Sequence, residues 1–117
     1  MAVCDDAAYF EKTITRIVAE ARSWDASFGQ PVPIVVDDAA KGPAYAVSSR
    51  EQRETLVKVA RASGLVLDPV YTGKAMHGLE RAVARGDVRR GARVLFLHTG
   101  GLPGLLAQGG TFGPELP

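Results

Sequence analysis

The sequence predicts an α/β fold in which short parallel strands are flanked by helices. Three segments carry apolar residues at helical spacing, and short runs of consecutive apolar residues lie between them. One such run, residues 94–97, leads directly into a glycine turn and a further short apolar helix, which is the local order of an α/β unit. With 117 residues, 46% of them hydrophobic, the chain has the size and composition of one folded domain.

Three amphipathic helices are expected, at residues 5–24, 49–64 and 74–85. Residues that favour helix ends accompany them: Asp5 or Asp6, the capping-box pair Ser49 and Gln52, and the glycines Gly64 and Gly86. A fourth, short helix is expected to contain Leu102, Leu105 and Leu106. The sequence therefore marks both ends of the second helix and the end of the third.

Three short strands are expected at residues 34–36, 65–67 and 94–97. Three strands are few for a sheet that stands alone, so we expect the chain to dimerise or to form part of something larger. Residues 109–117 hold three glycines and two prolines, which predicts a flexible tail after an ordered region of residues 1–108.

Composition excludes several classes of function. A net charge of +1 provides no broad electrostatic surface for nucleic acid or an anionic membrane. No apolar stretch is long enough to cross a bilayer, and no metal-ligand spacing is present. The single cysteine, Cys4, rules out an internal disulfide, and a cytoplasmic setting is the simplest expectation.

Two loops are candidates for a ligand site because each follows an expected strand and precedes an expected helix. They are residues 71–73, Tyr-Thr-Gly, and residues 98–101, His-Thr-Gly-Gly. In open α/β sheets, ligands bind outside the carboxyl ends of the strands, so the two loops are expected to face one crevice. The same residues are also typical of plain tight turns, and the pattern alone leaves both interpretations open.

Residues 68–76 (DPVYTGKAM) and 94–105 (VLFLHTGGLPGL) resemble two C-terminal signature stretches of the D-cysteine desulfhydrase and aminocyclopropane-carboxylate deaminase family. The resemblance extends over residues 33–108. It implies a pyridoxal-phosphate (PLP) enzyme of the tryptophan-synthase β-like fold, called fold type II, in which residues 1–108 form the C-terminal portion of the large, cofactor-binding domain. It also implies a small amino-acid substrate and, for the full-length family, a homodimer.

The resemblance assigns roles to particular residues. Tyr71 would face the substrate as a candidate for proton transfer, and Tyr45 would line the same pocket. Thr72 and Thr99 would stand near the pyridine nitrogen of PLP. Gly73 and Gly100 would contribute to cofactor binding, because glycine lets the backbone come close to a ligand. Ala44 and Ala46 depart from the family, which usually has glycines on both sides of this tyrosine.

Position 72 favours one branch of the family. The deaminases carry Glu there, whereas a neutral threonine beside the ring nitrogen suits elimination of thiolate from D-cysteine to give pyruvate, ammonia and sulfide. Nothing in the chain matches the family's Schiff-base lysine, and Lys74 is expected to support the site instead, so the chain alone is expected to be inactive. The alternatives are a deaminase-like enzyme, a phosphate-binding module at residues 98–101, or a self-associating fragment without catalysis.

Overall fold

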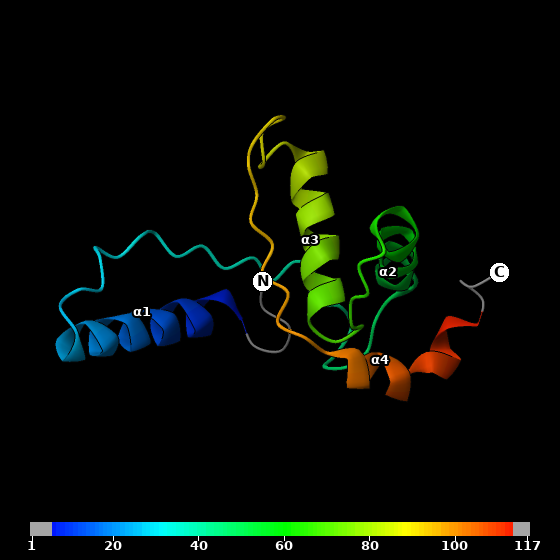
Figure 1. Cartoon of the computed structure of the whole chain (residues 1–117), viewed down its shortest axis with the longest axis horizontal. Coiled ribbons are helices and arrows are strands. Elements are labelled where there is room, and N and C mark those ends of the chain that lie inside the picture. The colour runs from blue at the N-terminus through cyan, green and yellow to red at the C-terminus, as the bar shows by residue number, and fades with distance from the viewer. Residues whose placement is uncertain (1–5, 114–117) are drawn as a thin grey trace.

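The computed structural model describes residues 6–113, and this region consists of helices and irregular segments without a sheet (Figure 1). The elements are α1 (Ala7–Trp24), α2 (Arg50–Ser63), α3 (Thr72–Arg85), α4 (Leu102–Ala107) and a 3-10 turn, η1 (Gly109–Phe112). Within the described residues, the only β-type pairing is an isolated antiparallel bridge between Ala44 and Val47.

The helix ends agree with the capping residues in the sequence. The Asp6 side chain accepts the N–H of Tyr9 at the start of α1, and Ser49 and Gln52 form a complete capping box at the start of α2. Both α2 and α3 end at glycines in the left-handed conformation, Gly64 and Gly86, with φ values of 73° and 85°. Asp5, the alternative cap of α1, lies outside the described residues.

The three expected strands are not formed in the described part of the chain, and this corrects the strand prediction. Residues 34–36, 65–67 and 94–97 are extended, but no backbone ladder joins them to one another. Val35 and Leu95 are 86% and 92% exposed, whereas an apolar run buried in a parallel sheet would be covered on both faces. The local pattern is that of a strand, but a strand also needs a neighbour to accept and donate its backbone hydrogen bonds.

The molecule is less compact than one domain of its length. Its Cα radius of gyration is 16.1 Å, against roughly 13 Å for a compact chain of this size. Figure 1 shows the reason, because α1 lies to one side of the other helices. No residue of α1 is buried, and Trp24 at its C-terminal end is 80% exposed.

The helices α2 and α3 pack on each other, and polar bonds join them. Lys58 on α2 pairs with Glu80 on α3 at 2.8 Å. The hydroxyl of Thr55, a residue that is 4% exposed, donates to the same carboxylate at 3.0 Å. These contacts hold α3, whose first turn carries the candidate loop, against α2.

A small hydrophobic core lies beside α2 and contains Leu56, Leu67 and Phe112. Phe112 belongs to η1 and is 4% exposed. Burial of this aromatic side chain packs residues 109–112 against the core, and the flexible tail expected at residues 109–117 stays a prediction. Residues 114–117 lie outside the described region.

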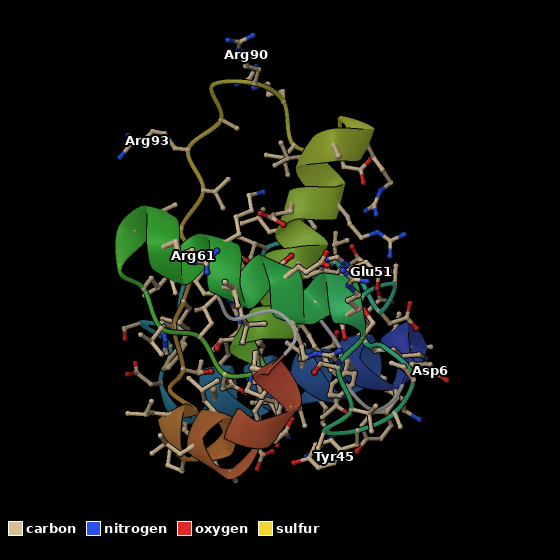
Figure 2. All side chains as sticks on the ribbon, turned by 90° about the vertical axis from the view of Figure 1, so that its right-hand side faces the viewer. Asp6, Tyr45, Glu51, Arg61, Arg90 and Arg93 are labelled. Carbon is tan, nitrogen blue, oxygen red and sulfur yellow. The ribbon has the colours of Figure 1, made fainter. Side chains whose placement is uncertain are left out.

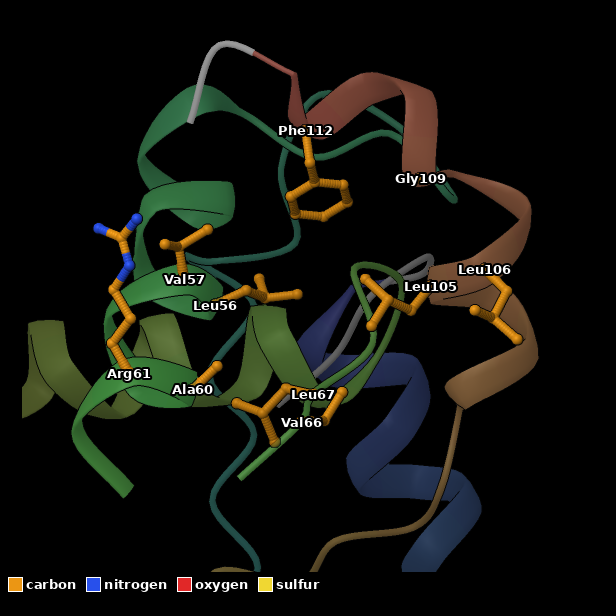
Figure 3. A pocket seen from close by; sticks show the side chains of 10 residues that line it. All are labelled: Leu56, Val57, Ala60, Arg61, Val66, Leu67, Leu105, Leu106, Gly109 and Phe112. Carbon is orange, nitrogen blue, oxygen red and sulfur yellow. The ribbon is translucent and has the colours of Figure 1, made fainter. Parts of the chain in front are cut away.

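An apolar hollow of about 350 Å³ opens next to this core, between α2, residues 66–67, α4 and η1 (Figure 3). Nine of its ten lining residues are apolar or glycine, and Arg61 at its edge is the exception. Such a lining lacks the convergent polar groups that fix a small polar ligand. The candidate site therefore lies elsewhere.

Candidate functional site

Asp68 organises the turn that starts α3. The residue is 1% exposed, and its Oδ1 atom accepts the backbone N–H groups of Val70 and Tyr71 at 2.8 and 2.7 Å. Its Oδ2 atom accepts the backbone N–H of Thr72 at 2.8 Å and the hydroxyl of Thr72 at 2.5 Å. The first N–H groups of a helix have no partner within the helix, and here the carboxylate of Asp68 accepts hydrogen bonds from N–H groups at the start of α3. This explains why α3 begins at Thr72, two residues before the predicted start.

These hydrogen bonds keep Asp68 ionised. Burial alone would raise the pKa of its carboxyl group, because desolvation penalises the charged form. The hydrogen bonds from Thr72, Tyr71 and Val70 favour the charged form more strongly, so the pKa lies below its ordinary value of 3.8. At neutral pH the start of α3 therefore holds one buried carboxylate that is fully engaged with the turn.

The two candidate loops lie against each other. Gly101 packs on the side chain of Asp68 so closely that a Cβ atom built at position 101 would sit 2.4 Å from Cγ of Asp68. A Cβ atom at Gly104 would lie 3.8 Å from the side chain of Val70. The sequence predicted that these two turns share one edge of the molecule, and the contacts confirm their adjacency.

His98 fastens the second loop to the first. The backbone N–H of Gly100 donates to Nδ1 of His98 at 3.0 Å, and Nε2 lies 2.9 Å from the carbonyl oxygen of Val66. Because Nδ1 accepts a hydrogen bond, Nε2 carries the proton and donates to Val66, which is the pattern of a neutral imidazole. His98 thus joins the second loop to the segment that precedes the first.

Two tyrosines meet at the exposed side of this region. The hydroxyl groups of Tyr45 and Tyr71 are hydrogen-bonded to each other, and the ring centroids lie 6.1 Å apart with an edge-to-face angle of 64°. The residues are 57% and 45% exposed, so the hydroxyl pair opens to solvent. Figure 2 shows Tyr45 at the opposite end of the molecule from Arg90 and Arg93. The structure thus brings the two tyrosines together, while their place in a substrate pocket stays a prediction.

The loop that carries Tyr45 has no regular structure, and side chains from three other elements hold it. Nε2 of Gln52 donates to the carbonyl of Ala40 at 2.7 Å, and Nε2 of Gln108 donates to the carbonyl of Ala46 at 3.2 Å. Nζ of Lys74 donates to two more loop carbonyls, those of Lys41 and Ala44, at 2.6 and 2.9 Å. The tyrosine contact therefore depends on the packing of this loop against α2, α3 and the end of α4.

Ala46 is strained within this loop. It has a φ of 57°, and it is the only residue other than glycine with positive φ among residues 6–113. The left-handed region costs an L-residue roughly 1–2 kcal/mol because its Cβ approaches the following carbonyl. The resembling family usually has glycine at position 46, and the left-handed backbone of Ala46 gives the physical reason.

Glycine at position 46 is expected to stabilise the chain. Ala46→Gly removes the left-handed strain, while the unfolded chain gains some entropy, so the net gain is about 0.5 kcal/mol in the free energy of unfolding. Ala44 is the matched control, because its φ is not positive. Ala44→Gly is expected to lower stability by a similar amount. Urea unfolding followed by circular dichroism measures both, and equal signs for the two substitutions would contradict the assignment of strain to position 46.

The other predicted site residues divide into two groups. Thr99 and Gly100 lie exposed on the second loop, and the Thr99 hydroxyl has no hydrogen-bond partner among residues 6–113. Thr72 is 3% exposed, its one O–H proton goes to Asp68, and its oxygen accepts the N–H of Asp68 at 2.9 Å. Gly73 is also buried, and a Cβ atom built on it would lie 2.5 Å from the carbonyl oxygen of Asp68. Thr72 and Gly73 are thus buried parts of the turn at the start of α3 and stabilise it.

Lys74 is the most deeply buried lysine of the described chain, with no exposed surface. Desolvation lowers the pKa of its ammonium group below the ordinary value of 10.5. Its nitrogen is committed to the two loop carbonyls, and no carboxylate pairs with it among residues 6–113. The described lysines at the surface are Lys12 on α1, Lys41, which pairs with Asp38 at 3.5 Å, and Lys58, which pairs with Glu80.

Sequence reasoning missed two parts of this site. Asp68 was interpreted only as the residue before a proline, although an Asp four residues before a Thr at a helix start is a recognisable capping signal. Gln52 was expected to cap α2, but its second bond, to the Ala40 carbonyl, joins segments that are distant in sequence. No local sequence pattern predicts a hydrogen bond between residues 12 positions apart.

Residues 5–100 match the sequence family described as pyridoxal-phosphate dependent enzyme. The chain belongs to this family. The PLP-dependent enzyme family implies the α/β class of fold, while the described residues contribute only its helices and extended segments. The match covers the first candidate loop, the second as far as Gly100, and the paired tyrosines Tyr45 and Tyr71.

Individual members of the PLP-dependent enzyme family resemble the chain in detail. A Thermotoga maritima protein named as a candidate 1-aminocyclopropane-1-carboxylate deaminase is 40% identical over 100 residues, 86% of this chain and 30% of its own length. A mitochondrial Arabidopsis thaliana protein, a bifunctional D-cysteine desulfhydrase/1-aminocyclopropane-1-carboxylate deaminase, is 39% identical over 88% of this chain and 25% of its own length. A Burkholderia multivorans 1-aminocyclopropane-1-carboxylate deaminase is 39% identical over 68% of this chain and 23% of its own length.

The chain thus spans less than a third of the length of these curated relatives. None of the helices that the structure describes combines the length and the apolar character of a membrane span. The described residues also contain no group of three or more His, Cys, Asp or Glu side chains that could hold a metal ion.

Proposed function

We propose that this chain supplies the substrate-facing tyrosines of a PLP-dependent lyase of the D-cysteine desulfhydrase type. The observation that carries the proposal is the hydrogen bond between the Tyr45 and Tyr71 hydroxyls, at the solvent side of a turn packed on the loop of Gly101. Two linked phenols can keep a proton at either oxygen, and this is what a residue that moves a substrate proton requires. The substrate is then a small amino acid that enters from the exposed side.

The second loop is compatible with the ring of PLP. A Cβ built at Gly100 meets no atom within 4 Å, so the backbone there is open to a flat group. The neighbouring Thr99 has a neutral hydroxyl without a partner in the described chain, and we assign to it the contact with the pyridine nitrogen. Bound PLP supplies an electron sink for the electrons released when the Cα proton of the substrate leaves.

We assign a different role to Thr72 and Gly73 in this proposal. Because the hydroxyl proton of Thr72 goes to Asp68, Thr72 has no second proton to donate to a pyridine nitrogen. Its part is to fix the turn that aims Tyr71, and Gly73 lets that turn pack on Leu56. Thr99, which we assign to the pyridine nitrogen, is also neutral, and a neutral residue there favours elimination from D-cysteine to pyruvate, ammonia and sulfide. The alternative is deaminase activity on 1-aminocyclopropane-1-carboxylate, the compound named in all three relatives.

We further propose that the chain alone does not hold PLP as an imine. Lys74 has no exposed surface, and its nitrogen is bonded to two carbonyls, so it is closed to an aldehyde. The described surface lysines have solvent-accessible side chains, whereas a lysine that forms an imine works in a desolvated pocket. The Schiff-base lysine then comes from another part of the working enzyme. Leu95 and Leu97, 92% and 76% exposed, are suited to packing against that part or against a second subunit of a homodimer.

A reconstitution experiment tests the proposed function. The chain mixed with PLP is expected to show no imine absorption band and to release no sulfide from D-cysteine. Addition of the part of the Thermotoga maritima relative that this chain does not match is expected to restore both. Each component alone is the control. Release of ammonia from 1-aminocyclopropane-1-carboxylate without sulfide from D-cysteine would favour the alternative, and an imine on Lys74 with turnover would overturn the proposal.

A further inference from the structure

Lys74 combines features that packing alone does not explain. It is fully buried on α3, three residues after Tyr71, and carries an ammonium group without a carboxylate partner among residues 6–113. Burying a charge costs several kcal/mol unless hydrogen bonds compensate, and an apolar side chain of similar volume would avoid that cost. The bonds that Lys74 does make should therefore have a specific purpose.

Those bonds lead to the other tyrosine. Nζ of Lys74 donates to the carbonyl of Lys41 at 2.6 Å and to that of Ala44, the residue before Tyr45, at 2.9 Å. The Ala44 carbonyl also accepts the N–H of Val47 at 3.2 Å, so the tie reaches the centre of the tight turn that carries Tyr45. One end of the Lys74 side chain is thus fixed to α3, which starts directly after Tyr71, and the other end to the loop of Tyr45.

We propose that Lys74 is a positioning residue that holds the Tyr45 loop on α3, so that the Tyr45 hydroxyl meets the hydroxyl of Tyr71. Of the remaining loop bonds, one lies further from Tyr45 along the chain and the other, next to Tyr45, is longer. Gln52 holds Ala40, five residues before Tyr45, and Gln108 holds Ala46 through a longer contact of 3.2 Å. Without Lys74, the segment between these two ties is free to move the phenol away from its partner.

The inference rests on the proposed function for its catalytic meaning, but its test needs neither cofactor nor turnover. Tyr9→Phe leaves Tyr45 and Tyr71 as the only tyrosines of the chain. Photo-oxidation with a ruthenium complex then couples these two rings to dityrosine, which is measured by its fluorescence in the monomeric protein. The yield reports how often the two rings are in contact.

Two isosteric side chains at position 74 isolate the ammonium group. Lys74→Cys is made with Cys4→Ser, so that position 74 carries the only thiol. The unfolded protein is alkylated with 2-bromoethylamine, which gives a lysine analogue, or with 1-iodopropane, which gives a neutral side chain of the same length, and is then refolded. Circular dichroism compares the helix content of the two products.

The lysine analogue is expected to give a dityrosine yield within about twofold of the protein with Lys74, and the neutral analogue a yield at least about fivefold lower at equal helix content. Gln108→Ala, which removes a different tie to the same loop, is expected to change the yield by less than twofold. Equal yields from the two analogues would overturn the proposal, as would loss of helix content in the neutral analogue alone, because Lys74 would then stabilise the fold as a whole. Failure of reconstitution with normal coupling would instead count against the proposed function alone.

Discussion

Alanine at position 101 is expected to lower the free energy of unfolding of the chain by about 3 kcal/mol. Gly101 has a φ of 113°, and a Cβ built there would lie 2.4–2.5 Å from three atoms of the Asp68 side chain. Asp68 cannot move aside, because its two carboxylate oxygens hold the start of α3. Gly101→Ala therefore adds a steric clash to backbone strain.

Gly100→Ala is the matched control for this prediction. Gly100 also has a positive φ, 101°, but a Cβ there would meet no atom within 4 Å. Only the strain of a side chain at positive φ remains, and the expected decrease in the free energy of unfolding is about 1–2 kcal/mol. Urea unfolding of both variants gives the difference in the free energy of unfolding. If Gly101→Ala were no more destabilising than Gly100→Ala, the two loops would not pack against each other as described, and the site would lose its basis.

The sequence predicted the parts of this structure that depend on neighbouring residues. The capping box of Ser49 and Gln52 and the left-handed glycines Gly64 and Gly86 act within one turn of a helix, so the local pattern is enough to place them. The extended segment at residues 94–97 has an equally clear local pattern. Its strand is not formed, because a β-ladder requires a second segment whose position no local pattern fixes.

The same distinction applies to the candidate site. The meeting of Tyr45 and Tyr71 was predicted from a family resemblance, since the residues are 26 positions apart and no periodicity links them. Thr72 was expected to face the cofactor, but its neighbour Asp68 takes its hydroxyl proton. A threonine has a single proton to donate, and a sequence pattern does not indicate which of two acceptors will receive it.

Asp68 is the other position where a small change is expected to have a large effect. Asp68→Asn keeps the shape of the side chain, but its amide group would replace one acceptor oxygen with a donor. That donor would face either the N–H and hydroxyl of Thr72 or the N–H groups of Val70 and Tyr71. Loss of hydrogen bonds to a buried charged group costs about 2–3 kcal/mol, and this is the decrease in the free energy of unfolding expected at pH 7.

The pH dependence of that difference tests its electrostatic origin. Because the folded-state pKa of Asp68 lies below its ordinary value of 3.8, the folded protein binds a proton here less readily than the unfolded chain does. The contribution of Asp68 is therefore complete above pH 3.8 and is lost as the pH falls through the lowered folded-state pKa. Urea unfolding at a series of pH values should show the stabilities of the original chain and of Asp68→Asn converging in acid.

Glu80→Gln separates this effect from general acid destabilisation. The pKa of Glu80 is also lowered, because the hydrogen bonds from Lys58 and Thr55 outweigh its desolvation, but Glu80 does not contact the α3 turn. Its replacement should leave the convergence between the original chain and Asp68→Asn unchanged. A stability difference that stays constant from pH 7 down to pH 2 would show that Asp68 acts through its shape and not through its charge. The carboxylate would then not be the group that sets the start of α3 and, with it, the direction of Tyr71.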